Sequence, residues 1–191
     1  MQIIARRVKD EGVRWLANVI LSHYHTAPWK GMPLGNWTSQ FFANIYLNEL
    51  DQFIKHKLRA KNYIRYVDDF VILHHSKTTL QEYETKIRRF LQMLKLELHP
   101  DKCQIIALCR GITFLGFRTF YHYKLVRERN IRKIWKRIRE MLDAYEAQKV
   151  GVSEILNTLQ GWQAYAKQGN TYHLRERIIN IAIKELEVRT K

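Results

Sequence analysis

The stretch that decides the fold is YIRYVDDFVIL, which occupies residues 63–73. Apolar residues precede and follow two neighbouring aspartates, Asp68 and Asp69. Two apolar runs separated by so short a polar segment predict a β-hairpin. Because Asp tolerates the backbone conformations of turns, we expect both aspartates to lie in the connecting turn. A solvated turn is the plain explanation of the pair, and a carboxylate site with a chemical role is the alternative.

The chemical alternative is that carboxylates at the tip of a rigid hairpin bind a divalent cation. Mg²⁺ prefers hard oxygen ligands and usually takes one or two carboxylates together with phosphates. In phosphoryl transfer, two such ions about 3.5–4 Å apart hold the attacking and leaving oxygens. Asp68 and Asp69 therefore predict Mg²⁺, or Mn²⁺ in its place, as the cofactor.

The charge of the chain favours a polyanionic partner. Among 191 residues, 33 Lys and Arg stand against 18 Asp and Glu, which leaves a net charge of +15. Such an excess costs self-repulsion and attracts nucleic acid, with an anionic membrane as the second choice. Hydrophobic residues make up 46% of the chain, which is enough for a core and argues against global disorder.

Cysteine use and hydropathy point to a cytoplasmic protein without a membrane partner. Cys103 and Cys109 form neither a disulfide framework nor a zinc-binding pattern, which fits a reducing compartment. The chain has no apolar run long enough to span a membrane, and its N-terminus lacks the features of a signal peptide.

Hydrophobic periodicity predicts an α+β layer followed, from about residue 125, by an α-helical unit. Gly111 and Gly116 mark turns between short strands. The helices are expected at residues 2–24 (with a break near Gly12), 38–58, 78–95, 127–148, 153–167 and 171–188, and strands, besides the hairpin, at 103–108, 112–115 and 117–123.

One predicted helix carries a dense cationic face. Residues 127–141 contain seven Lys or Arg against Glu128 and Glu140, opposite an apolar stripe. A solvated face is the usual explanation of such a run, but the scarcity of acids favours contact with nucleic-acid phosphates. The basic residues are Arg127, Arg129, Arg132, Lys133, Lys136, Arg137 and Arg139.

Several motifs in order resemble the reverse transcriptases. KGMPLGNWTSQFFANIYLNELDQFI (residues 30–54) followed by RYVDDF (65–70) resembles their Gly-rich loop, helix and Y-x-D-D box. LELHPDKCQI (96–105) is similar to the next block, and FLGFRTF (114–120) to the primer-grip block. The resemblance covers nearly the whole chain. It implies an α+β fold: the C-terminal part of a polymerase palm over residues 1–125, a small antiparallel sheet packed by helices, then an α-helical thumb over 126–191.

The resemblance assigns roles around the Y-x-D-D box. Asp68 corresponds to the carboxylate that binds catalytic metal, and Asp69 to its neighbour. Tyr66 corresponds to the tyrosine packed near the incoming nucleotide and the primer end. A loop and helix start line the nucleotide and template site, where a glycine lets the backbone approach the substrate. The corresponding residues are Gly35, Ser39 and Gln40.

The resemblance also assigns roles farther along the chain. Lys102 corresponds to a catalytic lysine near the triphosphate, although an ordinary exposed lysine after a Pro-Asp turn is an equal alternative. Phe114, Leu115, Gly116 and Phe117 correspond to the primer grip, and plain strand core with a glycine kink is compatible with that role. In the family a thumb helix holds the template–primer duplex, and its backbone-binding residues here are Arg132, Lys133, Lys136, Arg137 and Arg139.

Details of the loop and tail suggest the kind of retroelement. LGNWTSQ (34–40) has Ser39-Gln40 where group II intron and retroviral-like members more often carry Ser-Pro. The loop, and the tail QGWQAYAKQGNTYHLRERI (160–178), resemble bacterial enzymes, notably those of diversity-generating retroelements. Retron-like, group II intron-like and phage-defence relatives are the alternatives, which implies a bacterial or phage gene.

The chain departs from the family near its N-terminus. Reverse transcriptases need a further metal-binding aspartate on an earlier palm strand, and fingers that grip template and triphosphate. Asp10 lies in a polar break and Asp51 in the middle of a helix, so neither is a credible substitute. We therefore expect a truncated or split product that is inactive alone, with an accessory protein or second chain supplying the fingers and palm strand.

Two classes of function follow. The first is an RNA-directed DNA polymerase that uses an RNA template, a DNA primer, deoxynucleoside triphosphates and Mg²⁺ for two-metal nucleotidyl transfer. The second is a non-catalytic nucleic-acid-binding remnant, or a basic scaffold for an accessory protein.

Overall fold

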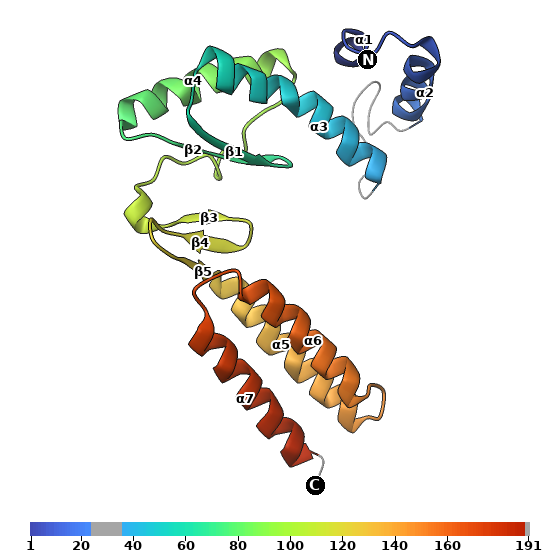
Figure 1. The fold of residues 1–191 in the computed structure, drawn as a ribbon, viewed down its shortest axis with the longest axis vertical. Helices are drawn as coiled ribbons and strands as arrows, with labels where there is room; N and C mark the ends of the chain where they lie inside the picture. The colour runs from blue at the N-terminus through green and yellow to red at the C-terminus, as the bar shows by residue number, and fades with distance from the viewer. Residues whose placement is uncertain (24–35, 190–191) are drawn as a thin grey trace. The chain divides into compact units, whose positions relative to one another are not determined.

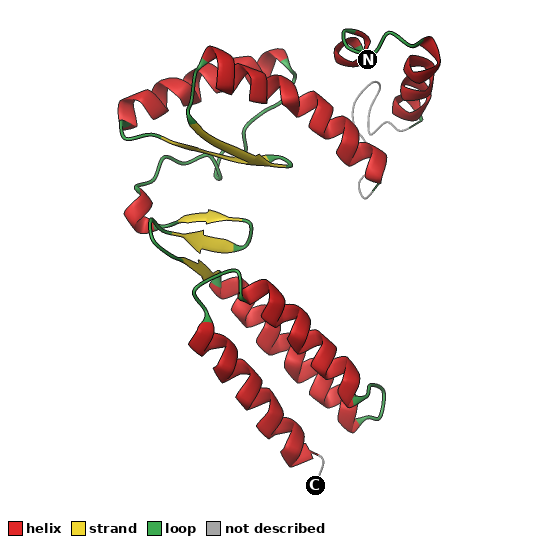
Figure 2. Ribbon diagram, viewed as in Figure 1, coloured by secondary structure: helices red, strands yellow, loops and turns green. Residues whose placement is uncertain are grey.

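The computed structural model describes residues 1–23 and 36–189. The fold is α+β, with helices and small antiparallel sheets, as expected for a polymerase palm with a helical thumb (Figure 1, Figure 2). The chain divides into two compact units, Met1–Ile105 and Ile106–Lys191. Gly35, one of the predicted site residues, lies outside the described residues.

The first unit begins with two short helices, so the helix expected over residues 2–24 is broken close to Gly12, as predicted. Helix α1 spans Gln2–Ala5 and α2 spans Glu11–Ser22. The break precedes Gly12, because Asp10 is the N-cap of α2 and its Oδ1 accepts a hydrogen bond from the Val13 amide at 2.8 Å. This capping contact gives Asp10 a local structural role.

Helices α3 and α4 build the core of the first unit. Helix α3 (Trp37–Gln52) continues as a π-helical turn, Phe53–Lys57. Helix α4 (Lys77–Met93) is capped by Ser76, whose hydroxyl accepts a hydrogen bond from the Thr79 amide at 3.2 Å. Side chains from both helices and the following turn form the buried cluster, against which Tyr63, Phe70 and Ile72 of the hairpin pack. The buried members are Leu50, Ile54, Ala60, Ile87 and Leu91.

The predicted hairpin is confirmed. Strand β1 (Asn62–Tyr66) pairs with β2 (Asp69–Leu73) in antiparallel register, with Tyr66 opposite Asp69. The turn therefore consists of Val67 and Asp68 alone. The expectation that both aspartates lie in the turn is wrong for Asp69, which begins β2, because the ladder closes at the Tyr66–Asp69 pair.

The second unit opens with a three-stranded antiparallel sheet. Its strands are β3 (Ile112–Phe114), β4 (Phe117–Thr119) and β5 (Lys124–Val126). The strand expected at 117–123 is interrupted at a turn, where the Phe120 amide donates to the Tyr123 carbonyl at 2.8 Å. The strand expected at 103–108 does not form. An apolar run becomes a strand only where a neighbouring backbone pairs with it. The partner of β3 is β4, and residues 103–108 are not part of that ladder.

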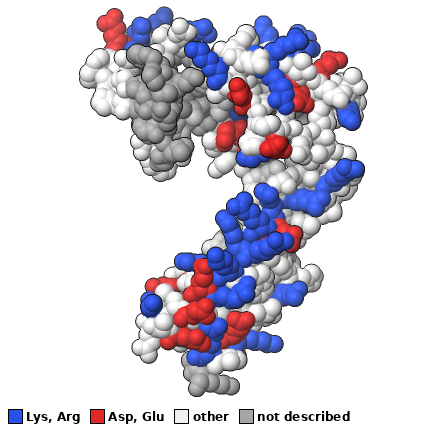
Figure 3. All heavy atoms as spheres, turned by 180° about the vertical axis from the view of Figure 1, so that it is seen from behind, with Lys and Arg blue, Asp and Glu red and all other residues white. Residues whose placement is uncertain are grey.

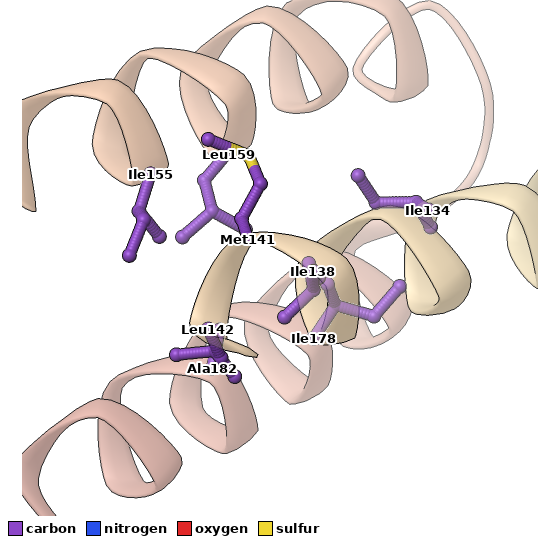
Figure 4. Packing of buried hydrophobic residues seen from close by; sticks show 8 residues of the cluster. All are labelled: Ile134, Ile138, Met141, Leu142, Ile155, Leu159, Ile178 and Ala182. Carbon is purple, nitrogen blue, oxygen red and sulfur yellow. The ribbon is translucent and has the colours of Figure 1, made fainter. Parts of the chain in front are cut away.

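Three helices complete the second unit: α5 (Glu128–Glu146), α6 (Val152–Ala166) and α7 (Tyr172–Arg189). Their apolar faces meet in one buried cluster, in which α5 side chains lie between α6 and α7 (Figure 4). The small sheet belongs to the same compact unit as these helices. The assignment of residues 1–125 to a palm and 126–191 to a thumb stays a prediction.

Candidate metal centre and nucleic-acid interface

The two aspartates of the hairpin are solvent-exposed carboxylates at the end of a short two-stranded sheet. Asp68 is the second residue of the turn, and Asp69 is the first residue of β2. Tyr66 lies directly across the ladder from Asp69, and its side chain is 59% exposed. Residues opposite each other in an antiparallel pair share a sheet face, so the Tyr66 ring and the Asp69 carboxylate are neighbours.

The turn beside these carboxylates has a strained backbone. Val67 has a φ angle of 54°, a left-handed conformation that β-branched residues rarely adopt. A conformation of this kind costs on the order of 1–3 kcal/mol and persists only where neighbouring contacts enforce it. Here the two-residue connection itself requires such a conformation, and the Arg65 guanidinium, which donates to the Val67 carbonyl at 2.6 Å, holds the turn in place.

Arg65 in turn is held by helix α3. Its Nε and Nη2 donate to the two oxygens of Asp51 at 2.8 and 2.6 Å, and its Nη1 also donates to Asn44 Oδ1 at 3.0 Å. The Tyr63 hydroxyl donates to the same carboxylate at 2.6 Å. Through these bonds the Asp51 carboxylate anchors β1 to α3. Because Arg65 also holds the Val67 carbonyl, the turn is anchored to α3 as well.

The pKa values of this network reflect its charge pairing. Burial alone would raise the pKa of Asp51, but the hydrogen bonds from Arg65 and Tyr63 outweigh it and hold the pKa below its ordinary value of 3.8. Burial, together with the neighbouring carboxylate of Asp51, raises the pKa of Tyr63. The hydrogen bond to Asp51 raises the pKa of Arg65. All three groups therefore keep their usual charge state at neutral pH.

Gln40 lies on the same face of α3 as the residues that contact the hairpin. Along β1, Tyr63 contacts Asp51, whereas Arg65, nearer the turn, also contacts Asn44. Approaching the carboxylate turn therefore means approaching the N-terminus of α3. Gln40 lies one helical turn, about 6 Å, beyond Asn44 on the same face. Its side chain is exposed, as a residue that lines a substrate site requires.

The remaining predicted residues of the first unit are less closely tied to the turn. The Ser39 hydroxyl is buried and has no hydrogen-bond partner within the described part of the chain. Lys102 is exposed in the turn that follows Pro100. The roles predicted for Ser39, Gln40 and Lys102 stay predictions.

The predicted primer-grip residues form the tight β3–β4 hairpin. Leu115 and Gly116 have φ angles of 49° and 83°, which is the backbone pattern of a two-residue type I′ turn. Leu115 is 46% exposed, whereas Phe117 is 6% exposed and belongs to a small core with Val126 and Ala166. Phe117 therefore supports the hairpin from inside, and Leu115 presents its surface.

The basic residues of α5 lie opposite its buried stripe, and all five predicted backbone contacts are exposed. Arg132 pairs with Glu128, and Lys136 and Arg137 approach Glu140 at 3.7 and 4.0 Å. Ion pairs as exposed as these are weak and exchangeable. Figure 3 shows many Lys and Arg atoms over the surface of this unit, interspersed with groups of Asp and Glu atoms. The unit thus has an exposed basic surface whose internal ion pairs are weak, and the phosphate contacts predicted for it stay a prediction.

Comparison with known protein families matches residues 2–119 to the family described as reverse transcriptase (RNA-dependent DNA polymerase). The chain belongs to the reverse transcriptase family. The match covers the hairpin, helices α3 and α4 and the first two strands of the second sheet. No curated protein matched the chain. Across the described residues, no helix is long and apolar enough to cross a membrane.

The donor set at the hairpin suits the divalent metal that reverse transcriptases use. Asp68 and Asp69 supply adjacent hard oxygen ligands, the number of carboxylates that Mg²⁺ commonly takes when phosphates complete its shell. Within residues 1–23 and 36–189, the side chains of His, Cys, Asp and Glu do not form a group of three that could hold a metal. The hairpin therefore offers two carboxylates toward such a metal, and their role as its ligands stays a prediction.

Sequence reasoning missed the Arg65–Asp51 anchor. Two signals for it exist. Arg65 alternates with Ile64 and Tyr66 along the strand and shares its face with Tyr63, so a charge on that packed face needs a partner. Asp51 interrupts the apolar pattern of α3 near the segment that packs on the hairpin.

Proposed function

We propose that this chain supplies the carboxylate hairpin and the duplex-binding surface of an RNA-directed DNA polymerase. The observation that carries the proposal is the strained Val67 turn, held by Arg65 next to Asp68 and Asp69. Backbone strain next to a partly buried ion pair is a feature that clusters at functional sites.

Asp68 and Asp69 are the residues that hold Mg²⁺ or Mn²⁺ in this proposal. When bound, the metal offsets the negative charge that develops on the phosphoryl group during nucleotidyl transfer. The protein groups have separate tasks. Arg65 fixes the turn, Tyr66 presents a ring beside Asp69 for the nucleotide and primer end, and Gln40 lines the template side.

The outer face of the hairpin supports a further part of the proposal, that another polypeptide segment completes the palm. Ile64 and Leu73 are 57% and 41% exposed, on the sheet face that also carries Tyr66. A two-stranded hairpin is marginal by itself and gains stability from further strands and a covered apolar face. A segment that added a strand here could bring a third carboxylate to Asp68. We propose that the chain without such a segment is inactive.

The finer identity is part of the same proposal. We infer a bacterial or phage retroelement enzyme, of the diversity-generating type or a group II intron-like or retron-like relative, acting in the cytoplasm. Its substrates are an RNA template, a DNA primer and deoxynucleoside triphosphates, and its partner is an accessory protein. The support is the loop LGNWTSQ and the tail that begins QGWQAYAKQG.

Primer extension tests the proposal. The 191-residue chain, with Mg²⁺ and an RNA–DNA primer template, is assayed alone and mixed with a polypeptide carrying the fingers and first palm strand of a related enzyme. We expect extension only in the mixture, and its loss with Asp68→Asn. Robust extension by the chain alone would refute the missing-segment part, and activity of the Asp68→Asn mixture would refute the metal-ligand role.

A non-catalytic nucleic-acid-binding protein is the second candidate, and the exposed basic face of α5 favours it. The variant Asp68→Asn also distinguishes the two candidate functions. If binding is the whole function, Asp68→Asn leaves duplex affinity unchanged or higher, and no added segment produces extension.

A further inference from the structure

One backbone carbonyl in the second unit collects an unusual number of donors. The carbonyl of Gly116, in the β3–β4 turn, accepts hydrogen bonds from the Arg127 amide at 3.0 Å, Asn130 Nδ2 at 3.3 Å and the Tyr165 hydroxyl at 3.0 Å. Asn130 Nδ2 also donates to the Tyr165 oxygen at 2.8 Å. The donors come from the start of α5 and the end of α6. The turn is therefore tied to both helices at one atom.

The residue at this position has to be glycine for two independent reasons. Its φ angle of 83° is strained for any residue with a side chain. A Cβ atom there would also clash with the Tyr165 hydroxyl and lie 2.9 Å from Asn130 Nδ2. The space that a side chain would need is occupied by the groups that hold the carbonyl, so the close approach and the hydrogen bonds are parts of one arrangement.

The same face of α5 continues into the basic surface. Asn130, Lys133 and Arg137 are spaced three and four residues apart, so they lie on one helix face. Lys133 and Arg137 are exposed. They lie about one and two helical turns along α5 from Asn130, the residue that contacts the β3–β4 hairpin. A nucleic-acid strand whose phosphates contact these two side chains would run toward the exposed Leu115.

We propose that Asn130 and Tyr165 are positioning residues that preset the Leu115–Gly116 turn for the primer strand, so that the turn and the basic face of α5 bind the duplex as one rigid element. The inference rests on the proposed function, since it takes a template–primer duplex as the ligand. The advantage of a preset turn is that no conformational freedom has to be lost there when the duplex binds.

Removing a single hydroxyl tests the idea. Tyr165→Phe keeps the ring that packs on Phe117 at a centroid distance of 4.9 Å and deletes only two hydrogen bonds, the one donated to the Gly116 carbonyl and the one accepted from Asn130. The matched control is Tyr145→Phe, which deletes a half-buried hydroxyl of the same helical unit that makes no hydrogen bond to Gly116. Asn130→Ala and the double variant with Tyr165→Phe complete a cycle.

The measurement is the Kd of the full chain for an RNA–DNA duplex with a recessed DNA 3′ end, at several salt concentrations, alongside single-stranded RNA. We expect Tyr165→Phe, which removes two neutral hydrogen bonds, to weaken duplex binding at least about fivefold. The slope of log Kd against log salt should not change, because the phosphate contacts remain. The two substitutions should be non-additive, since they disrupt one network. Hydrogen exchange of β3 and β4 checks that the sheet still folds.

The outcomes separate the two claims. If the unaltered chain does not prefer duplex to single-stranded RNA, both the proposed function and this inference fail. If it does, and Tyr165→Phe binds like the unaltered chain or Tyr145→Phe weakens binding equally, only the positioning role fails. A changed salt slope in Tyr165→Phe would likewise contradict it, because it would mean that phosphate contacts were lost.

Discussion

Replacing Asp51 by Asn should loosen the carboxylate hairpin without touching its aspartates. The carboxylate accepts one bond from Tyr63 and two from Arg65, and the Arg65 and Asp51 side chains are only 12% and 19% exposed. Asn keeps the shape but turns one acceptor into a donor that faces the guanidinium. Because breaking a fully buried pair costs about 3–5 kcal/mol, and this pair is only partly buried and keeps one acceptor, we expect a loss at the lower end, about 3 kcal/mol.

Hydrogen exchange measured by mass spectrometry localises this loss to one unit. A local destabilisation of about 3 kcal/mol corresponds to roughly hundredfold faster exchange in peptides that cover β1 and β2. Peptides from α5 to α7, in the other compact unit, should exchange as before. The matched control is Glu84→Gln, which removes a partly exposed pair with Arg88 on α4. Its effect should stay below about 1 kcal/mol.

The reasoning would be refuted by hairpin exchange in Asp51→Asn that stays within about threefold of the unaltered chain, a difference below about 0.7 kcal/mol. Equal effects of Asp51→Asn and Glu84→Gln would also refute it, because burial of the pair would then make no difference. In either case the Val67 backbone would need another source of restraint.

Three further predictions concern pH, glycines and salt. The folded-state pKa of Asp51 is depressed. Its contribution to stability is therefore present above about pH 3.8 and is lost as the pH falls through the folded-state pKa. An acid titration followed by circular dichroism should accordingly be less steep for Asp51→Asn than for the unaltered chain. Gly116→Ala should destabilise the second unit by about 2–3 kcal/mol in urea, whereas Gly161→Ala, in open space inside α6, should stabilise it by about 0.5–1 kcal/mol; equal effects would contradict the Gly116 geometry. Lys133→Ala should lower the salt slope of duplex binding by about 0.9 with no change in melting temperature, and an unchanged slope would remove Lys133 from the phosphate contacts.

Local patterns in the sequence were enough to predict most elements of this protein. The hairpin, helices α3 to α7 and the basic face of α5 all follow from the spacing of apolar and charged residues, because strand and helix periodicities are properties of a few consecutive residues. The order of motifs was enough to predict the reverse transcriptase family, which the match over residues 2–119 confirmed.

Pairing between distant residues decided the rest. Whether residues 103–108 form a strand, and that β5 exists at all, depended on which backbone each segment met. Asp69 entered β2 because the ladder closed across Tyr66. The two anchors join residues 14 positions apart, Arg65 and Asp51, and 49 positions apart, Gly116 and Tyr165. Periodicity says which face of an element is buried, but only the tertiary structure decides which polar atom on that face finds a partner, since that depends on distances across the fold.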